Sequence, residues 1–201
     1  MPGTVASAHV MAMLGGIIYL VAVTKEWLAF KYLLKPTVTL LIAYPTKDST
    51  AGIFYGLLLS TLGDIFLMIP RQDMFIPGLL SFLLAHIVYI ASFRNASLRM
   101  SWAAVPLAAY AAVMMSALLP GVSKEDAVVQ VGVVIYVLVI TVMAYKASLT
   151  GNALLVAGTL LFCASDSILA WDKFLHSYSW CEFGIMLTYY AAQLCISIAH
   201  S

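Results

Sequence analysis

The sequence predicts an all-α polytopic membrane protein, a bundle of eight transmembrane helices with both termini on the same face. Three observations predict this fold class. Hydrophobic residues make up 63% of the 201 residues and charged residues only 9%, against roughly a quarter charged in soluble domains. The mean hydropathy of +1.00 leaves too few polar side chains to cover a water-facing surface. The apolar residues also fall into eight runs with short polar breaks. We therefore expect a single integral membrane domain over residues 1–201.

A hydrocarbon core about 30 Å thick needs about 20 apolar residues per helical span. Runs that approach this length predict helices at about 6–24, 33–46, 50–69, 74–93, 102–119, 126–146, 151–171 and 179–199.

Each predicted element has a local justification. The first run lacks a basic segment before it and stays apolar through Gly15–Leu20, so we interpret it as a span rather than a signal peptide. The second is the shortest, because Lys35 and Pro36 stand near its start and Pro45 near its end. Turn-forming or polar residues separate the other six at 70–73, 94–97, 120–123, 146–152 and from 172 onward. Such short breaks favour antiparallel neighbours.

Composition also argues against several functional classes. A formal net charge of +1 gives no electrostatic reason to expect nucleic acid as a partner. The three cysteines lie in apolar stretches without CxxC or CxxH spacing, which favours buried small side chains over metal ligands or a disulfide frame. Among the histidines only His86 is deep in a span, so we expect no metal. The GxSxG elbow of serine hydrolases is absent.

Two aspartates stand where lipid penalises charge. Asp64 and Asp166 lie five or six residues from their predicted helix ends, roughly 7–9 Å inside at 1.5 Å per residue. An ionisable group in a span costs at least about 2.5 kcal/mol on insertion scales, so each of these aspartates needs a functional or structural explanation. Both helices run in the same direction, which places the two carboxylates at matching depth. Glu182 differs, because it lies within a turn of the membrane face and can reach headgroups.

The predicted topology brings further polar groups to the same region. These are Lys35 at the start of the second helix, and His86, Tyr89, Tyr190 and Gln193 in the middle of the membrane. We expect them to converge with the aspartates on one cavity that opens toward the face opposite the termini. Small residues, Gly63 and Ser165, precede the aspartates and allow close helix approach. Inter-helix hydrogen bonds without chemistry remain the alternative interpretation of these residues.

Five segments stand out in chain order: Lys35–Pro36, Gly63–Leu67, Ala85–Tyr89, Ser165–Asp172 and Tyr189–Leu194. Together they resemble the YhhN-type lysoplasmalogenase family. The strings Ala170–Asp172 and Tyr189–Gln193 are especially similar to its animal branch. The resemblance covers about residues 15–199. It implies an eight-span membrane enzyme that hydrolyses the vinyl ether bond of lysoplasmalogen (1-alkenyl-glycerophosphoethanolamine or -choline). The products are a fatty aldehyde and glycerophosphoethanolamine or glycerophosphocholine. The family implies no cofactor.

The expected chemistry is acid–base catalysis by Asp64 and Asp166. A vinyl ether yields to acid, because protonation of the carbon away from oxygen gives an oxocarbenium ion that water attacks. Two buried carboxylates can supply the proton, stabilise the cation and activate the water, as in glycosidases. We expect Asp166 as the acid, Asp64 as the base, and the two carboxyls to share a proton.

The other groups suit a lysophospholipid. Lys35 can meet the phosphate, and Trp171, Tyr189 or Tyr190 can hold the cationic head together with Asp172. His86 can orient a carboxylate or relay a proton, and Tyr89 and Gln193 can position water or the glycerol.

Two other functions stay open at this stage, a small proton-coupled membrane transporter and another intramembrane lipid hydrolase. The expected partners are the lysophospholipid and the bilayer. The expected location is the endoplasmic reticulum membrane in a eukaryote or the inner membrane in a bacterium, and homo-oligomerisation stays open.

Overall fold

The computed structural model describes residues 2–71, 74–93 and 101–201. In this part of the chain there are eight α-helices and one 3₁₀ turn, in the order α1 (Pro2–Thr24), α2 (Leu28–Ala43), η1 (Tyr44–Thr46), α3 (Ala51–Met68), α4 (Phe75–Ser92), α5 (Ala104–Val122), α6 (Ala127–Ser148), α7 (Ala153–Phe174) and α8 (Cys181–Ile198). The predicted break at 94–97 and residues 72–73 of the break at 70–73 lie outside the described residues.

The all-α fold class is confirmed. Seven of the helices in the described ranges are long and apolar enough to cross a membrane. The remaining helix, α2, has 16 residues, so a count of eight spans stays a prediction.

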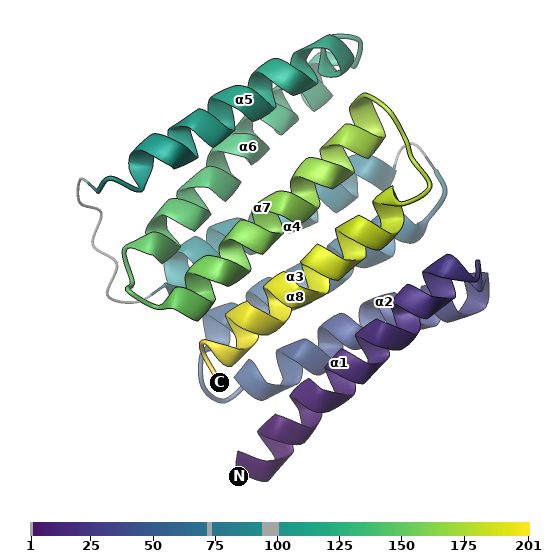
Figure 1. Ribbon diagram of the computed structural model, residues 1–201, viewed down its shortest axis with the longest axis vertical. Coiled ribbons are helices and arrows are strands. Elements are labelled where there is room, and N and C mark those ends of the chain that lie inside the picture. Colours follow the sequence, from purple (N-terminus) through teal and green to yellow (C-terminus); the bar gives the residue numbers. More distant parts are fainter. Residues whose placement is uncertain (1, 72–73, 94–100) are drawn as a thin grey trace.

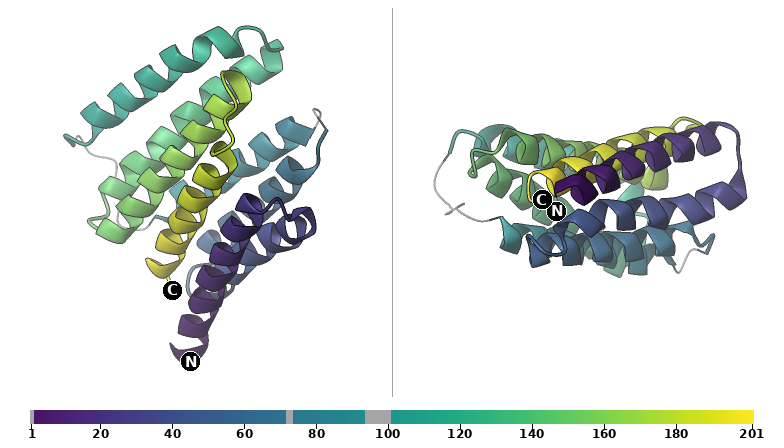
Figure 2. Two further views of the ribbon diagram at one scale, coloured as in Figure 1. Left: turned by 45° about the vertical axis from the view of Figure 1, so that its right-hand side comes forward. Right: turned by 90° about the horizontal axis from the view of Figure 1, so that it is seen from below.

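The helices pack in two layers. In Figure 1 the nearer layer runs α5, α7, α8 and α1, and the fainter layer behind it runs α6, α4, α3 and α2. The view from below in Figure 2 shows these layers edge-on. Both chain ends lie toward the same end of the bundle (Figure 1), where His9 Nε2 is 3.0 Å from Ser197 Oγ. On which side of a membrane the termini lie stays a prediction.

The predicted start of the second helix was wrong. Helix α2 begins at Leu28, five residues before the expected position, so Lys35 and Pro36 stand in its middle. A proline inside a helix removes one backbone hydrogen bond, yet the helix continues through it. The turn before α2 explains the early start, because Glu26 adopts a positive φ of 57° and reverses the chain tightly after α1. Lys35 is thereby carried deeper into the bundle than predicted.

Glycines let α3 and α4 approach closely in the rear layer. A Cβ atom at Gly63 would lie 2.6 Å from the ring of Phe82, and one at Gly78 would lie 2.7 Å from Leu67. Both distances are too short for a real contact, so only hydrogen fits at these positions. Because Asp64 follows Gly63 directly, the close packing of α3 on α4 also fixes where this carboxylate points.

Candidate active site

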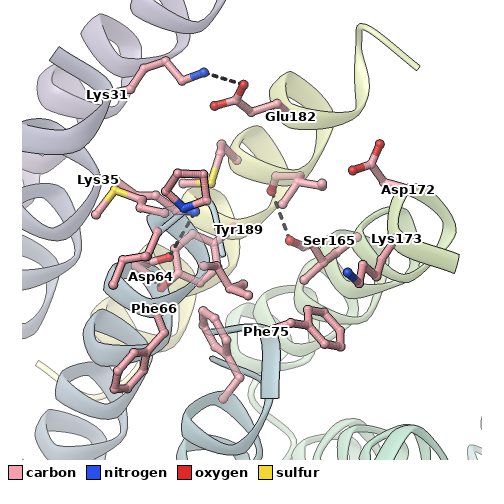
Figure 3. Close-up of a pocket in the computed structure, with 18 of the residues that line it drawn as sticks. Lys31, Lys35, Asp64, Phe66, Phe75, Ser165, Asp172, Lys173, Glu182 and Tyr189 are labelled. Carbon is pink, nitrogen blue, oxygen red and sulfur yellow. Dashed lines mark hydrogen bonds and ion pairs between the residues drawn. The ribbon is translucent and has the colours of Figure 1, made fainter. Parts of the chain in front are cut away.

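A cavity of about 540 Å³ lies between the two helix layers. Side chains from α1, α7 and α8 line it on one side, and side chains from α2, α3 and α4 line it on the other. The lining includes the first turns of α2 and α8 and the last turns of α3 and α7, so the cavity opens at the end of the bundle away from the chain termini. Figure 3 shows this pocket, with Lys35 and Asp64 on one wall and Ser165 on the other.

Asp64 is held by three groups. Thr39 Oγ1 donates to its Oδ2 at 2.9 Å, and Tyr189 Oη donates to the same oxygen at 2.8 Å. The Lys35 ammonium lies 3.8 Å from Oδ1. The side chain of Asp64 is only 2% exposed. A buried carboxylate with a cation and two hydroxyl donors in contact has the partners that a charged form requires.

Spacing along α2 explains two of these contacts. Lys31, Lys35 and Thr39 follow one another at intervals of four residues, which places them on one face of the helix. That face turns toward the cavity: Lys31 Nζ pairs with Glu182 Oε2 at 2.6 Å, and the next two residues reach Asp64. The early start of α2 is what makes this polar stripe complete.

Asp166 has different surroundings. Tyr136 Oη donates to its Oδ2 at 2.7 Å, and His86 Nε2 lies 4.0 Å from the same oxygen. Its side chain is 13% exposed, more than that of Asp64, and lines the cavity. Within the described residues no lysine or arginine forms an ion pair with Asp166. This carboxyl is therefore the more accessible and the less charge-compensated of the two.

His86 is completely buried, and neither ring nitrogen has a hydrogen-bond partner among the described residues. Its ring packs edge-on against Tyr136, with centroids 5.2 Å apart, and against Phe162 at 4.6 Å. An unpartnered polar group in a protein interior is uncommon and calls for an explanation. The nearest acidic oxygen is that of Asp166, so His86 is placed to act on this carboxyl.

The two aspartates line one cavity but do not hydrogen-bond to each other. Each carboxylate Oδ2 accepts from its own tyrosine. The proton-sharing contact that we expected from the sequence therefore has no counterpart among the hydrogen bonds of the described residues, because the partners contributed by α2, α6 and α8 keep each carboxyl on its own wall.

Five more of the predicted supporting residues make contacts within the protein or lie outside the cavity lining. Ser165 lines the cavity, but its hydroxyl donates to the Ile185 carbonyl at 3.1 Å and joins α7 to α8. Tyr190 packs against Tyr19 with its hydroxyl 3.5 Å from the Lys35 carbonyl. Tyr89 and Gln193 are both buried in the core, where the Tyr89 hydroxyl donates to Gln193 Oε1 at 2.9 Å. Trp171 is 42% exposed and does not line the cavity.

Charged residues surround the cavity mouth. The Lys31–Glu182 pair closes one side, where Tyr19 Oη also donates to Glu182 at 3.3 Å. Asp172 and Lys173 lie on the other side, on α7 (Figure 3). As expected, Glu182 stands in the first turn of α8, and its side chain is 44% exposed at the cavity mouth. Arg71 adds a further cation to the lining.

Sequence reasoning found the aspartates but missed Tyr136, Thr39 and Lys31. The signal for Thr39 and Lys31 was their spacing of four residues from Lys35, which a helix start at 33 concealed. The signal for Tyr136 was weaker, a phenol in the middle of an apolar helix. Such tyrosines are common in cores. The described residues contain no group of three or more His, Cys, Asp or Glu side chains that could hold a metal ion.

Comparisons with known proteins identify the family of this chain. The sequence model of the YhhN family matches residues 27–200. Lysoplasmalogenase TMEM86A of Bos taurus is 36% identical over 166 residues, which cover 77% of this chain and 67% of that protein. Lysoplasmalogenase TMEM86A of Homo sapiens is 32% identical over 179 residues, 84% of this chain and 71% of that protein. Lysoplasmalogenase TMEM86B of Homo sapiens is 31% identical over 158 residues, which cover 77% of this chain and 66% of that protein.

The chain thus spans about two thirds of the length of these relatives. No solved structure is significantly similar to it. The family resemblance and the likeness to animal proteins that we expected from five sequence segments are both confirmed. The apolar helices and the match over most of the chain describe an integral, multi-pass membrane protein that belongs to the YhhN family.

Proposed function

We propose that this protein is a lysoplasmalogenase, an enzyme that hydrolyses the vinyl ether bond of lysoplasmalogen. The products are a fatty aldehyde and glycerophosphoethanolamine or glycerophosphocholine. One structural observation carries the proposal: two carboxyl groups with unlike surroundings, Asp64 and Asp166, line a single cavity inside an apolar bundle. The relatives named lysoplasmalogenase support the choice of substrate.

The surroundings assign the two roles. Asp64 has an ammonium and two hydroxyl donors in contact, so it stays a carboxylate. Among the described residues Asp166 has no lysine or arginine in contact and one hydroxyl donor, so in this proposal it carries a proton and serves as the general acid. Its greater exposure to the cavity lets it reach the substrate. The pair thereby provides one acid and one base at the same time, which hydrolysis of a vinyl ether requires.

The first step moves a proton from Asp166 to the alkenyl carbon that does not carry oxygen. The positive charge that forms is shared between the other alkenyl carbon and the ether oxygen, and the Asp64 carboxylate stabilises it. Water then adds to this carbon and gives its proton to Asp64, which leaves a hemiacetal. When the hemiacetal collapses, Asp166 takes the hydroxyl proton and Asp64 protonates the departing glycerol oxygen. Both carboxyls return to their starting states.

Tyr136 and His86 support the acid. Once Asp166 has lost its proton, the hydrogen bond from the Tyr136 hydroxyl to Oδ2 stabilises the negative charge of the carboxylate. The His86 ring nitrogen, 4.0 Å away and otherwise unpartnered, becomes a second donor after a small displacement. Interactions that strengthen as charge develops lower the activation barrier rather than the energy of the bound substrate.

The cavity mouth suits a phospholipid head. Lys31, Arg71 and Lys173 supply positive charge for the phosphate, and Glu182 and Asp172 supply negative charge for an ammonium or choline group. Lys35, which we first expected to meet the phosphate, instead serves Asp64.

The test uses purified protein in detergent micelles with two substrates, lysoplasmalogen and its saturated 1-alkyl analogue. The proposal expects free aldehyde from the first and no product from the second, because only a vinyl ether forms an oxocarbenium ion on protonation. Release of fatty acid from a 1-acyl lysophospholipid, or no product from lysoplasmalogen, would contradict it. Transport of lysoplasmalogen into vesicles without cleavage would favour the transporter alternative.

A further inference from the structure

A second, apolar cavity adjoins the candidate active site. It holds about 50 Å³ of empty space between α4, α5, α6 and α7, with lining side chains such as Leu79, Met114, Leu118 and Val137. It shares Asp166 with the main cavity, together with four apolar residues, Leu67, Phe75, Phe82 and Leu169. The two cavities are therefore direct neighbours, and Asp166 stands at the boundary between them.

The polar groups in the lining of this slot bond to one another. Tyr110 Oη lies 3.0 Å from Ser167 Oγ, and Ser167 Oγ donates to the Cys163 carbonyl at 2.6 Å. The remaining phenol, that of Tyr136, donates to Asp166. With these hydroxyls satisfied, the slot offers a visiting molecule apolar surface apart from the Asp166 carboxyl at its boundary, whereas the main cavity offers several charges. Hydrocarbon is what such a surface binds.

We propose that this slot, here called the α4–α7 slot, binds the hydrocarbon chain of the substrate next to its vinyl ether bond. This inference rests on the proposed function. In a lysoplasmalogen the scissile bond lies where the polar glycerophosphate part meets the aliphatic chain. The acid at the boundary between a charged cavity and an apolar slot stands at the matching place in the protein.

The size of the slot limits how much of the chain it receives. Its volume of about 50 Å³ is smaller than the roughly 150 Å³ of an apolar cavity that takes up one benzene. The slot therefore holds only the first carbons beyond the double bond, and the rest of the chain continues toward the lipid. These first carbons fix the orientation of the alkenyl group against Asp166.

The test narrows the slot with Ala170→Phe, one helical turn after Asp166 on α7. The same change at Ala112, an exposed position of α5, is the matched control. Aldehyde release is measured with a hexadecenyl and a propenyl lysoplasmalogen, the second of which has almost no chain to place. We expect Ala170→Phe to lower the ratio of kcat/KM for the long over the short substrate by about tenfold or more, and Ala112→Phe to leave it unchanged.

A second variant keeps the test decisive if Ala170→Phe does not fold. Met114→Phe adds bulk from α5 at a half-buried, flexible side chain, and we expect the same change of ratio. An unchanged ratio in either folded slot variant would overturn the α4–α7 slot while leaving the proposed function intact. If the wild-type protein releases aldehyde from neither substrate, the proposed function is wrong and the slot assignment falls with it.

Discussion

At the scale of single residues, the two aspartates differ in their partners rather than in their chemistry. Asp64 is surrounded by a lysine, a threonine and a tyrosine, whereas Asp166 has a tyrosine and an unpartnered histidine nearby. In the proposed mechanism, identical side chains acquire opposite roles from their neighbours. In this account, the asymmetry is the property that makes acid–base catalysis available inside an apolar bundle.

The first residue-scale prediction concerns Tyr136. Tyr136→Phe removes the hydroxyl that donates to Asp166 Oδ2 and leaves the ring in place. A hydrogen bond to a charged group contributes about 1.5–3 kcal/mol, so we expect kcat to fall by about 10- to 100-fold with KM nearly unchanged. Steady-state aldehyde release measures both constants.

The matched control for this prediction is Tyr55→Phe, at a tyrosine of α3 that is 59% exposed. It should leave both constants unchanged. A rise in KM with constant kcat in Tyr136→Phe would mean that this hydroxyl binds substrate and does not serve the acid.

The second residue-scale prediction concerns Lys35. Lys35→Met leaves the buried Asp64 without its cation, which we expect to lower the free energy of unfolding by about 3–5 kcal/mol. Adding Asp64→Asn to that variant removes the uncompensated charge and should restore most of the loss. Thermal unfolding in detergent measures both effects.

A surface pair provides the comparison. Lys47 and Asp48 form an exposed ion pair, so Lys47→Met should cost about 1 kcal/mol or less. The coupling between Lys35 and Asp64 would be contradicted if the double variant lost as much free energy of unfolding as the Lys35→Met and Asp64→Asn variants lose together.

The residues of the candidate site could be predicted from the sequence only where a residue type is unusual in its surroundings. A carboxylate in an apolar run is costly, so Asp64 and Asp166 were visible from the sequence. Tyr136 was not visible, because buried tyrosines are ordinary, and its role depends on α6 facing α7. The depth of Lys35 was predicted wrongly because Lys35 and Pro36 were placed near the start of the second helix, which in fact begins at Leu28.

At the scale of helices, close packing decides where the candidate catalytic groups point. Helix α3 can lie against α4 because glycines stand at the contact, and Gly63 directly precedes Asp64. Helix α2 contributes a polar stripe at four-residue spacing, and α7 and α8 are joined by the Ser165 hydroxyl. The lengths of the apolar runs and the polar breaks between them predicted all eight helices to within a few residues, apart from the start of α2. It could not predict which helices become neighbours across the two layers.

The helix-scale prediction concerns Gly63. In Gly63→Ala the new Cβ would lie 2.6 Å from the Phe82 ring, so the ring or the helix must move. We expect a loss of about 1–3 kcal/mol in the free energy of unfolding, together with lower kcat, because Phe82 also packs against Tyr189 at a centroid distance of 5.9 Å.

The same substitution at Gly132 of α6 is the control, since a Cβ there would meet Leu79 at an ordinary 3.5 Å. Gly132→Ala should be neutral or slightly stabilising, as expected for a helix interior. If both variants unfold at the same temperature, close packing of α3 on α4 is not what holds Asp64 in place.

At the scale of the whole molecule, the two-layer arrangement creates a charged cavity and an apolar slot that meet at Asp166. No single helix contains this feature. It arises because α7 lies next to α8 on one side and next to α5 and α6 on the other (Figure 1). The sequence predicted one cavity at the end opposite the termini, but the junction depends on side-chain packing between layers.

The measurement that tests the central claim most directly is hydrolysis of lysoplasmalogen in deuterium oxide, with the aldehyde reduced at once to prevent exchange. Protonation by the acid predicts one solvent deuterium on the carbon next to the aldehyde carbon. Asp64→Asn and Asp166→Asn should each lower aldehyde formation by orders of magnitude, whereas Asp48→Asn, at a side chain that is 87% exposed, should not. Aldehyde without deuterium, or undiminished release from the Asp166→Asn variant, would contradict the account.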